Sequence, residues 1–98
     1  MKIIELDLTG CKYPGELHER IRDAFHFPEE YGANWSAFWD FLWSECDADR
    51  VLIKGEDGLQ KDFMKHLEKL HEILERNIAF RNENGLNAFS YEIIHADS

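Results

Sequence analysis

The residues best suited to chemistry gather between positions 28 and 43, a stretch that holds three tryptophans, a tyrosine and several acids. Trp35, Trp39 and Trp43 recur at one-turn helical spacing, and Asp40 follows the second of them. A carboxylate among indole rings can accept a strong, charge-assisted hydrogen bond from an Arg or Lys of another molecule. Tryptophan and tyrosine are also typical anchors of protein interfaces. These residues predict a binding face, whereas packing within the chain's own core is the alternative for the tryptophans.

A helix that begins at Trp35 would divide this stretch into two stripes. Asn34 suits the N-cap, and Gly32 permits a positive φ in the approach. The first stripe is apolar and consists of Phe38, Phe41, Leu42 and the stem of Glu45. The second stripe carries the tryptophans beside Ser36 and Asp40. One stripe is enough to dock so short a helix, so the second must be covered by another part of the fold or by another molecule.

The rest of the chain offers no catalytic or metal-binding pattern. His66 and His71 are five residues apart on one predicted helix and do not share a face, and the other three histidines are isolated. The sequence has no nucleophile elbow and no glycine-rich phosphate loop. Cys11 and Cys46 fit neither a disulfide framework nor a zinc pattern, which predicts two reduced thiols. We therefore expect no enzyme, no cofactor and no metal.

The charge balance is strongly acidic, with 20 Asp+Glu against 11 Lys+Arg in 98 residues and a formal charge of −9. This balance argues against binding a nucleic acid backbone or an anionic membrane. It fits a cationic partner, whose approach it would accelerate, although solubility alone is the other explanation. Glu5 and Asp7 interrupt the N-terminal apolar run, so we expect no signal peptide, and no run reaches the length of a membrane span. The expected compartment is the cytoplasm.

The hydrophobic pattern predicts a single domain, residues 1–98, with the order β-α-α-β-α-β. The expected strands are 3–8, 50–54 and 88–95, and the expected helices are 16–25, 34–45 and 59–76. Helical connections favour a small parallel sheet of three strands, and the consecutive apolar residues of 50–54 predict a strand buried on both faces. For residues 78–86 we favour helix or irregular structure, with Gly85 as a helix stop. A hairpin turn at Asn84 and Gly85 is the alternative.

Between Leu17 and about Ile53 the chain resembles the barstar family, the intracellular inhibitors of barnase-type ribonucleases. The residues that carry the resemblance are Leu17 and His18, Pro28 and Glu29, Tyr31 and Gly32, Asn34, Ala37, Trp39 and Asp40, and Leu42. The resemblance implies an α/β fold with a three-stranded parallel sheet. It also implies a negatively charged face, in which a helix and the loop before it enter the nuclease active site and acids mimic the RNA phosphates.

Single positions can be carried over from this resemblance. Asp40 matches the family's central acid, which fills the site of the scissile phosphate, and Trp39 matches the adjacent tryptophan. Asn34 and Gly32 match the loop. The family also has an acidic contact residue on its last helix, but beyond Ile53 the resemblance does not show which residue corresponds to it.

Three positions depart from the family pattern. The acid one turn before Asp40 is Ser36, and the tyrosine before the Tyr-Gly pair is Glu30. The position of the second exposed tryptophan is Glu45, with Trp43 nearby. These departures leave the fold inference intact but not the identity of the partner.

The leading hypothesis is a ribonuclease inhibitor or immunity protein that occludes the cationic active site of a basic nuclease toxin. The alternative is a non-inhibitory interaction or regulatory module of the same fold, and an enzyme ranks last. The candidate partner-binding residues are Glu30, Tyr31, Asn34, Trp35, Ser36, Trp39, Asp40 and Trp43.

Overall fold

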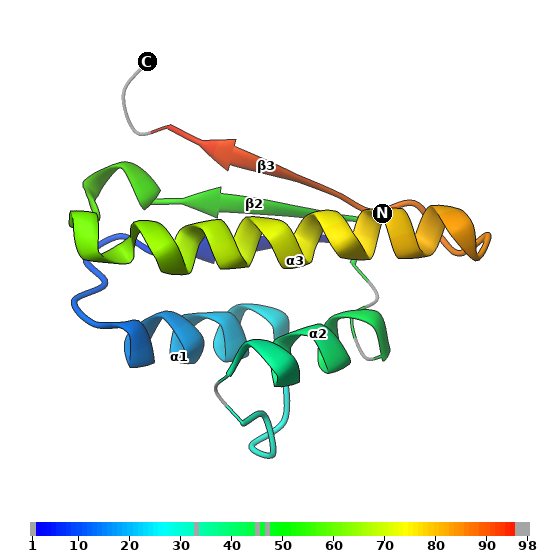
Figure 1. Cartoon of the computed structure of the whole chain (residues 1–98), viewed down its shortest axis with the longest axis horizontal. Helices are drawn as coiled ribbons and strands as arrows, with labels where there is room; N and C mark the ends of the chain where they lie inside the picture. The colour runs from blue at the N-terminus through cyan, green and yellow to red at the C-terminus, as the bar shows by residue number, and fades with distance from the viewer. Residues whose placement is uncertain (1, 33, 45, 47, 96–98) are drawn as a thin grey trace.

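The computed structural model of the chain describes residues 2–32, 34–44, 46 and 48–95. Its elements are β1 (Ile3–Asp7), α1 (Pro14–Phe25), α2 (Trp35–Ser44), β2 (Arg50–Lys54), α3 (Met64–Glu83) and β3 (Ser90–Ile94). Two 3₁₀ turns, η1 (Glu56–Gly58) and η2 (Lys61–Phe63), lead from β2 into α3. The order β-α-α-β-α-β is the predicted one, and α3 lies over the sheet, roughly along its strands, with α1 and α2 on the same side (Figure 1).

The three strands form one parallel sheet in the order β1-β2-β3, which confirms the predicted α/β class. Ile4 pairs with Val51 and Leu6 with Ile53, and all four side chains are buried beneath the helices. The side chains that alternate with them are exposed or half-buried. The prediction that β2 is buried on both faces is therefore wrong, because the helices cover one face and leave Leu52 half-buried on the other.

Within the described residues, the buried apolar side chains form one continuous cluster between the sheet and the helices. The helical spacing of the apolar positions decides which side of each helix enters this cluster. Its fully buried helix residues are Leu17, Ile21, Phe38, Leu42, Leu70 and Leu74. The face of α2 that lies opposite this cluster is thereby turned outward.

The last helix runs to Glu83, which confirms the favoured helical interpretation of residues 78–83 and excludes the hairpin. Gly85 has a φ of 67°, and the Leu86 N–H donates to the Arg81 carbonyl oxygen at 2.9 Å. Many helices end in this way, with a left-handed glycine and a backbone hydrogen bond that spans five residues instead of four. The extra turns carry Asn77 and Arg81 over the end of α2.

Arg81 joins α3 to the C-terminal end of α2. Its side chain is only 7% exposed, and its guanidinium donates to the carbonyl oxygens of Cys46 at 2.9 Å and Leu42 at 3.5 Å. The same group lies 5.1 Å from the ring centre of Phe89, just before β3. A cation is favourable at a helix C-terminus, where carbonyl groups lack partners. This side chain thus helps to hold α2 against α3.

Gly55 follows β2 at a position that tolerates no side chain. Its φ is 86°, and a Cβ there would lie 2.3 Å from the backbone nitrogen of Thr9. Gly58 in η1 is a matched control, since its φ is not positive and a Cβ would meet no described atom within 4 Å. We expect Gly55→Ala to lower the free energy of unfolding by about 2 kcal/mol or more. Gly58→Ala should stay within about 0.5 kcal/mol in the same urea titration, and equal midpoints would contradict this assignment.

Arg81→Met should lower the free energy of unfolding by about 2 kcal/mol, because the carbonyl groups at the end of α2 lose a charged donor. Lys65→Met, at an exposed position of the same helix, is the matched control and should change stability by less than about 0.5 kcal/mol. Chemical denaturation of both variants measures the difference. A fully stable Arg81→Met protein would show that the guanidinium does not hold the two helices together.

Candidate partner-binding face

The start of α2 is fixed by Asn34. Its Oδ1 accepts a hydrogen bond from the Ala37 N–H at 2.8 Å, which confirms the predicted N-cap, and its Nδ2 donates to the Gly32 carbonyl oxygen at 3.1 Å. Gly32 itself has no positive φ, so that expectation is wrong. A Cβ at this position would lie 3.0 Å from the Asn34 amide nitrogen, so the glycine leaves room for the cap. Both polar atoms of Asn34 therefore serve the loop's own geometry.

The apolar stripe of α2 packs inward as predicted. Phe38 and Leu42 are fully buried, while Phe41 is half-buried with its ring centre 5.3 Å from that of Phe27. Glu45, which was expected to extend this stripe, lies outside the described residues. The inward stripe fixes the rotation of the helix, so Ser36 and Asp40 are exposed.

The tryptophan stripe is partly covered by other elements of the chain. The Trp35 ring centre lies 4.5 Å from that of His18, and Trp39 and Trp43 lie 5.8 and 5.9 Å from Phe80 of α3. Trp35 and Trp39 are half-buried, whereas Trp43 keeps 46% of its surface exposed. Packing within the fold thus accounts for much of this stripe, and Trp43 retains the largest free surface of the three.

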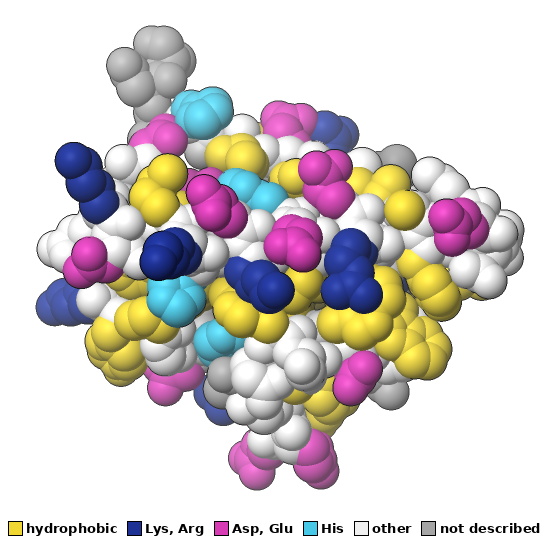
Figure 2. All heavy atoms as spheres, in the orientation of Figure 1, with side chains coloured by type: hydrophobic (Ala, Val, Ile, Leu, Met, Phe, Trp, Pro, Cys, Tyr) yellow, Lys and Arg dark blue, Asp and Glu magenta, His cyan; other side chains and the backbone are white. Residues whose placement is uncertain are grey.

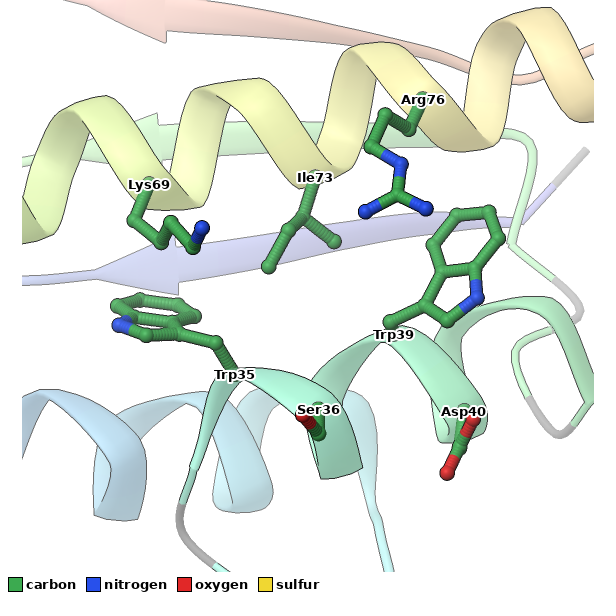
Figure 3. Close-up of a pocket in the computed structure, with 7 residues that line it drawn as sticks. All are labelled: Trp35, Ser36, Trp39, Asp40, Lys69, Ile73 and Arg76. Carbon is green, nitrogen blue, oxygen red and sulfur yellow. The ribbon is translucent and has the colours of Figure 1, made fainter.

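The acids of the predicted face are turned to solvent. Glu30 and Asp40 are exposed, and the Asp40 carboxylate points away from α3 (Figure 3). The Trp39 ring leaves α2 on the other side, toward α3, and Trp35 also lies in the space between the helices (Figure 3). The carboxylate is therefore accessible, but the indoles lie to one side of it and do not surround it.

Tyr31 lies in the core and not on the surface. Its side chain is 6% exposed, and its hydroxyl oxygen lies 2.8 Å from Nδ1 of His18. Burial raises the pKa of Tyr31 and lowers that of His18, which His66 lowers further by like charge. This pair anchors the loop before α2 to α1. Tyr31 is thus a positioning residue, and its predicted contact with a partner does not fit this burial.

A pocket of about 260 Å³ lies between α2 and α3 (Figure 3). Its lining brings together four of the predicted residues, namely Trp35, Ser36, Trp39 and Asp40, with Lys69, Ile73 and Arg76 of α3. The Arg76 guanidinium carbon lies 4.8 Å from the centre of the Trp39 ring. The three α3 residues were not predicted, although their spacing of four and three residues places them on one helix stripe.

The charge pattern of this side of the molecule is mixed. Figure 2 shows Lys and Arg side chains in a row over hydrophobic side chains at the centre of the view, with Asp and Glu around them. Lys69 and Arg76 lie on the α3 side of the pocket, opposite Ser36 and Asp40. The negatively charged face that the resemblance implies therefore has two cations at its edge.

Other chemistry is sparse in the part of the chain that the structure describes. There, three or more His, Cys, Asp or Glu side chains nowhere gather closely enough to hold a metal ion. Neither Cys11 nor Cys46 forms a disulfide with a described residue, and burial raises the pKa of the Cys11 thiol. Among the described helices, none combines the length and the apolar character that crossing a membrane requires.

The buried His18 predicts a loss of stability in mild acid. Folding disfavours its protonated form, so the unfolded chain binds this proton at higher pH, and stability must fall as the pH drops below about 6.5. His18→Gln should flatten the dependence of Tm on pH between about 7.5 and 5.5. His26→Asn, which changes an exposed histidine, should keep the wild-type slope. An unchanged slope in the His18 variant would assign the effect to other groups.

The sequence was compared with known protein families and with curated proteins. The family model described as Barstar (barnase inhibitor) matches residues 1–90 of the 98-residue chain, from β1 to the first residue of β3. The comparison with curated proteins gave no match. The family match, the parallel three-stranded sheet and the element order agree. The chain therefore belongs to the Barstar family of barnase inhibitors.

Proposed function

We propose that this protein inhibits a basic nuclease toxin, a ribonuclease, by inserting α2 and the loop before it into the cationic active site. The observation that carries the proposal is the exposed Asp40 carboxylate on α2, in a chain of the Barstar family. Inhibition of this kind needs no turnover and no cofactor, because it acts by occlusion and by charge.

The contacts divide by chemistry. Asp40 would accept charge-assisted hydrogen bonds from an Arg or Lys of the nuclease at the place of a substrate phosphate. Glu30 adds a second exposed carboxylate on the loop, and the Ser36 hydroxyl lies one helical turn before Asp40. Trp43 offers an exposed indole, the kind of side chain that most often anchors an interface.

The face is preorganised for binding. The Asn34 cap, the buried Tyr31–His18 pair and the Arg81 contacts hold α2 and its loop in place before any partner arrives. Binding through a fixed backbone avoids the entropic cost of ordering a loop. The net charge of −9 would add long-range attraction toward a basic partner, which raises the association rate at low salt.

Barnase is the first nuclease to test. Wild-type protein should inhibit its cleavage of RNA with one-to-one stoichiometry, and Asp40→Asn should weaken binding by about 30-fold or more, the loss typical of an interface hot spot. Asp23→Asn is the matched control, because Asp23 is an exposed aspartate on α1, outside the proposed face. Calorimetric titration of the three proteins against barnase gives the comparison.

The result can go against the proposal in two ways. Equal affinity of the Asp40 and Asp23 variants would show that α2 is not the inhibitory face. An association rate that does not change with ionic strength, with RNA cleavage continuing in the complex, would indicate the non-inhibitory interaction module instead.

A further inference from the structure

The pocket between α2 and α3 has an apolar interior and a cationic rim. Ile73, which is 3% exposed, lies between Lys69 and Arg76 on α3, and Trp35 and Trp39 face it from α2 (Figure 3). The Arg76 guanidinium rests against the Trp39 ring, which fixes its position while its N–H groups keep their capacity to donate. This arrangement can hold the aliphatic stem of a side chain and bind a charged group at its end.

Neither rim cation forms a salt bridge with a described residue of the chain. Across the described residues, Arg20, Arg50 and Lys54 each pair with a glutamate, but neither Lys69 nor Arg76 has a carboxylate within salt-bridge distance. The chain has nearly twice as many acids as bases, yet these two cations lie about two turns apart on one face of α3 and line the same pocket. Their positive charge is available to an anion from outside.

The charge of the surroundings restricts what that anion can be. Asp40 lines the same pocket, and the chain carries −9 overall, which disfavours a phosphate chain or any other polyanion. A single carboxylate on a flexible aliphatic stem satisfies Lys69 and Arg76 and brings little charge near Asp40. The stem of a glutamate or aspartate side chain also suits the Ile73 floor and the indole walls.

We propose that this pocket is a subsite for an acidic side chain of the protein partner. The inference rests on the proposed function and specifies the partner further: its contact surface carries a carboxylate for Lys69 and Arg76 next to a cation for Asp40. The partner surface is therefore charge-mixed, and a uniformly basic active site would be repelled at this rim.

A titration of the free protein tests the subsite without any nuclease. N-acetylglutamate amide, added at constant ionic strength, should shift the indole N–H resonances of Trp35 and Trp39 with millimolar affinity, and N-acetylglutamine amide should not. The shifts should disappear in Lys69→Gln/Arg76→Gln and persist in Lys65→Gln, which removes an exposed lysine of α3 outside the pocket lining. Equal shifts from both probes would overturn the proposal. Uridine monophosphate binding more tightly than the glutamate probe would do the same and would indicate a nucleotide site.

Binding to barnase gives a second test, in which the sign of the effect decides. If an acid of barnase enters the pocket, Lys69→Gln and Arg76→Gln should each weaken binding by roughly tenfold, while Lys65→Gln has little effect. Tighter binding of the two pocket variants would show that the cations repel the partner and would overturn the subsite. Loss of affinity on Asp40→Asn alone would leave the inhibitor function standing without this subsite. A glutamate-specific shift without barnase inhibition would support the subsite and count against the proposed function.

Discussion

The contact of the Arg81 guanidinium with carbonyl groups at the C-terminal end of α2 is the constraint on which the proposed binding face depends. The helices α2 and α3 are separated in the chain by β2 and two turns, and their mutual position decides whether Trp39 meets Phe80 and whether Asp40 and Arg76 line one pocket. Apolar packing between helices tolerates small slides, whereas hydrogen bonds to defined carbonyl oxygens do not. A buried cation that donates to Cys46 and Leu42 therefore fixes the register of the face as well as its stability.

Local signals in the sequence were sufficient for most of the fold. The strands, the Asn34 cap and the inward turn of Phe38 and Leu42 follow from propensities and periodicity that act within a few residues. Leu52 was misjudged, because three consecutive apolar residues cannot reveal whether helices cover one face of a sheet or both. The end of α3 was also left open by local signals. Gly85 can end a helix only if the residues before it are helical, and the sequence allowed two structures there.

The surroundings of the proposed binding face were harder to predict because they depend on the tertiary structure. Periodicity places the tryptophans on one side of α2, but it cannot say that Phe80 and Arg76, about 40 residues later, lie against Trp39. Tyr31 was predicted to contact a partner, but its ring packs against Phe27 and Phe41 and its hydroxyl lies beside His18, contacts that periodicity cannot predict. A family resemblance predicts the role of a residue only where the sequences align. Lys69 lies beyond the aligned part, so its charge in the pocket was not predicted.

Long-range and short-range electrostatics have different tasks on this surface. Over distances greater than about 8 Å, salt screens individual charges, and only the net excess of acids acts on an approaching partner. At contact, each ionic group meets one counterpart in a partly desolvated setting. There the free-energy penalty of an unpaired charge exceeds the stabilisation that a paired charge provides. If the proposed subsite is correct, an acidic chain that carries Lys69 and Arg76 across the pocket from Asp40 would attract many basic proteins and still reject those without a carboxylate at the right place. Under the proposed function, the net charge would raise the association rate, while the two cations would set the choice of partner.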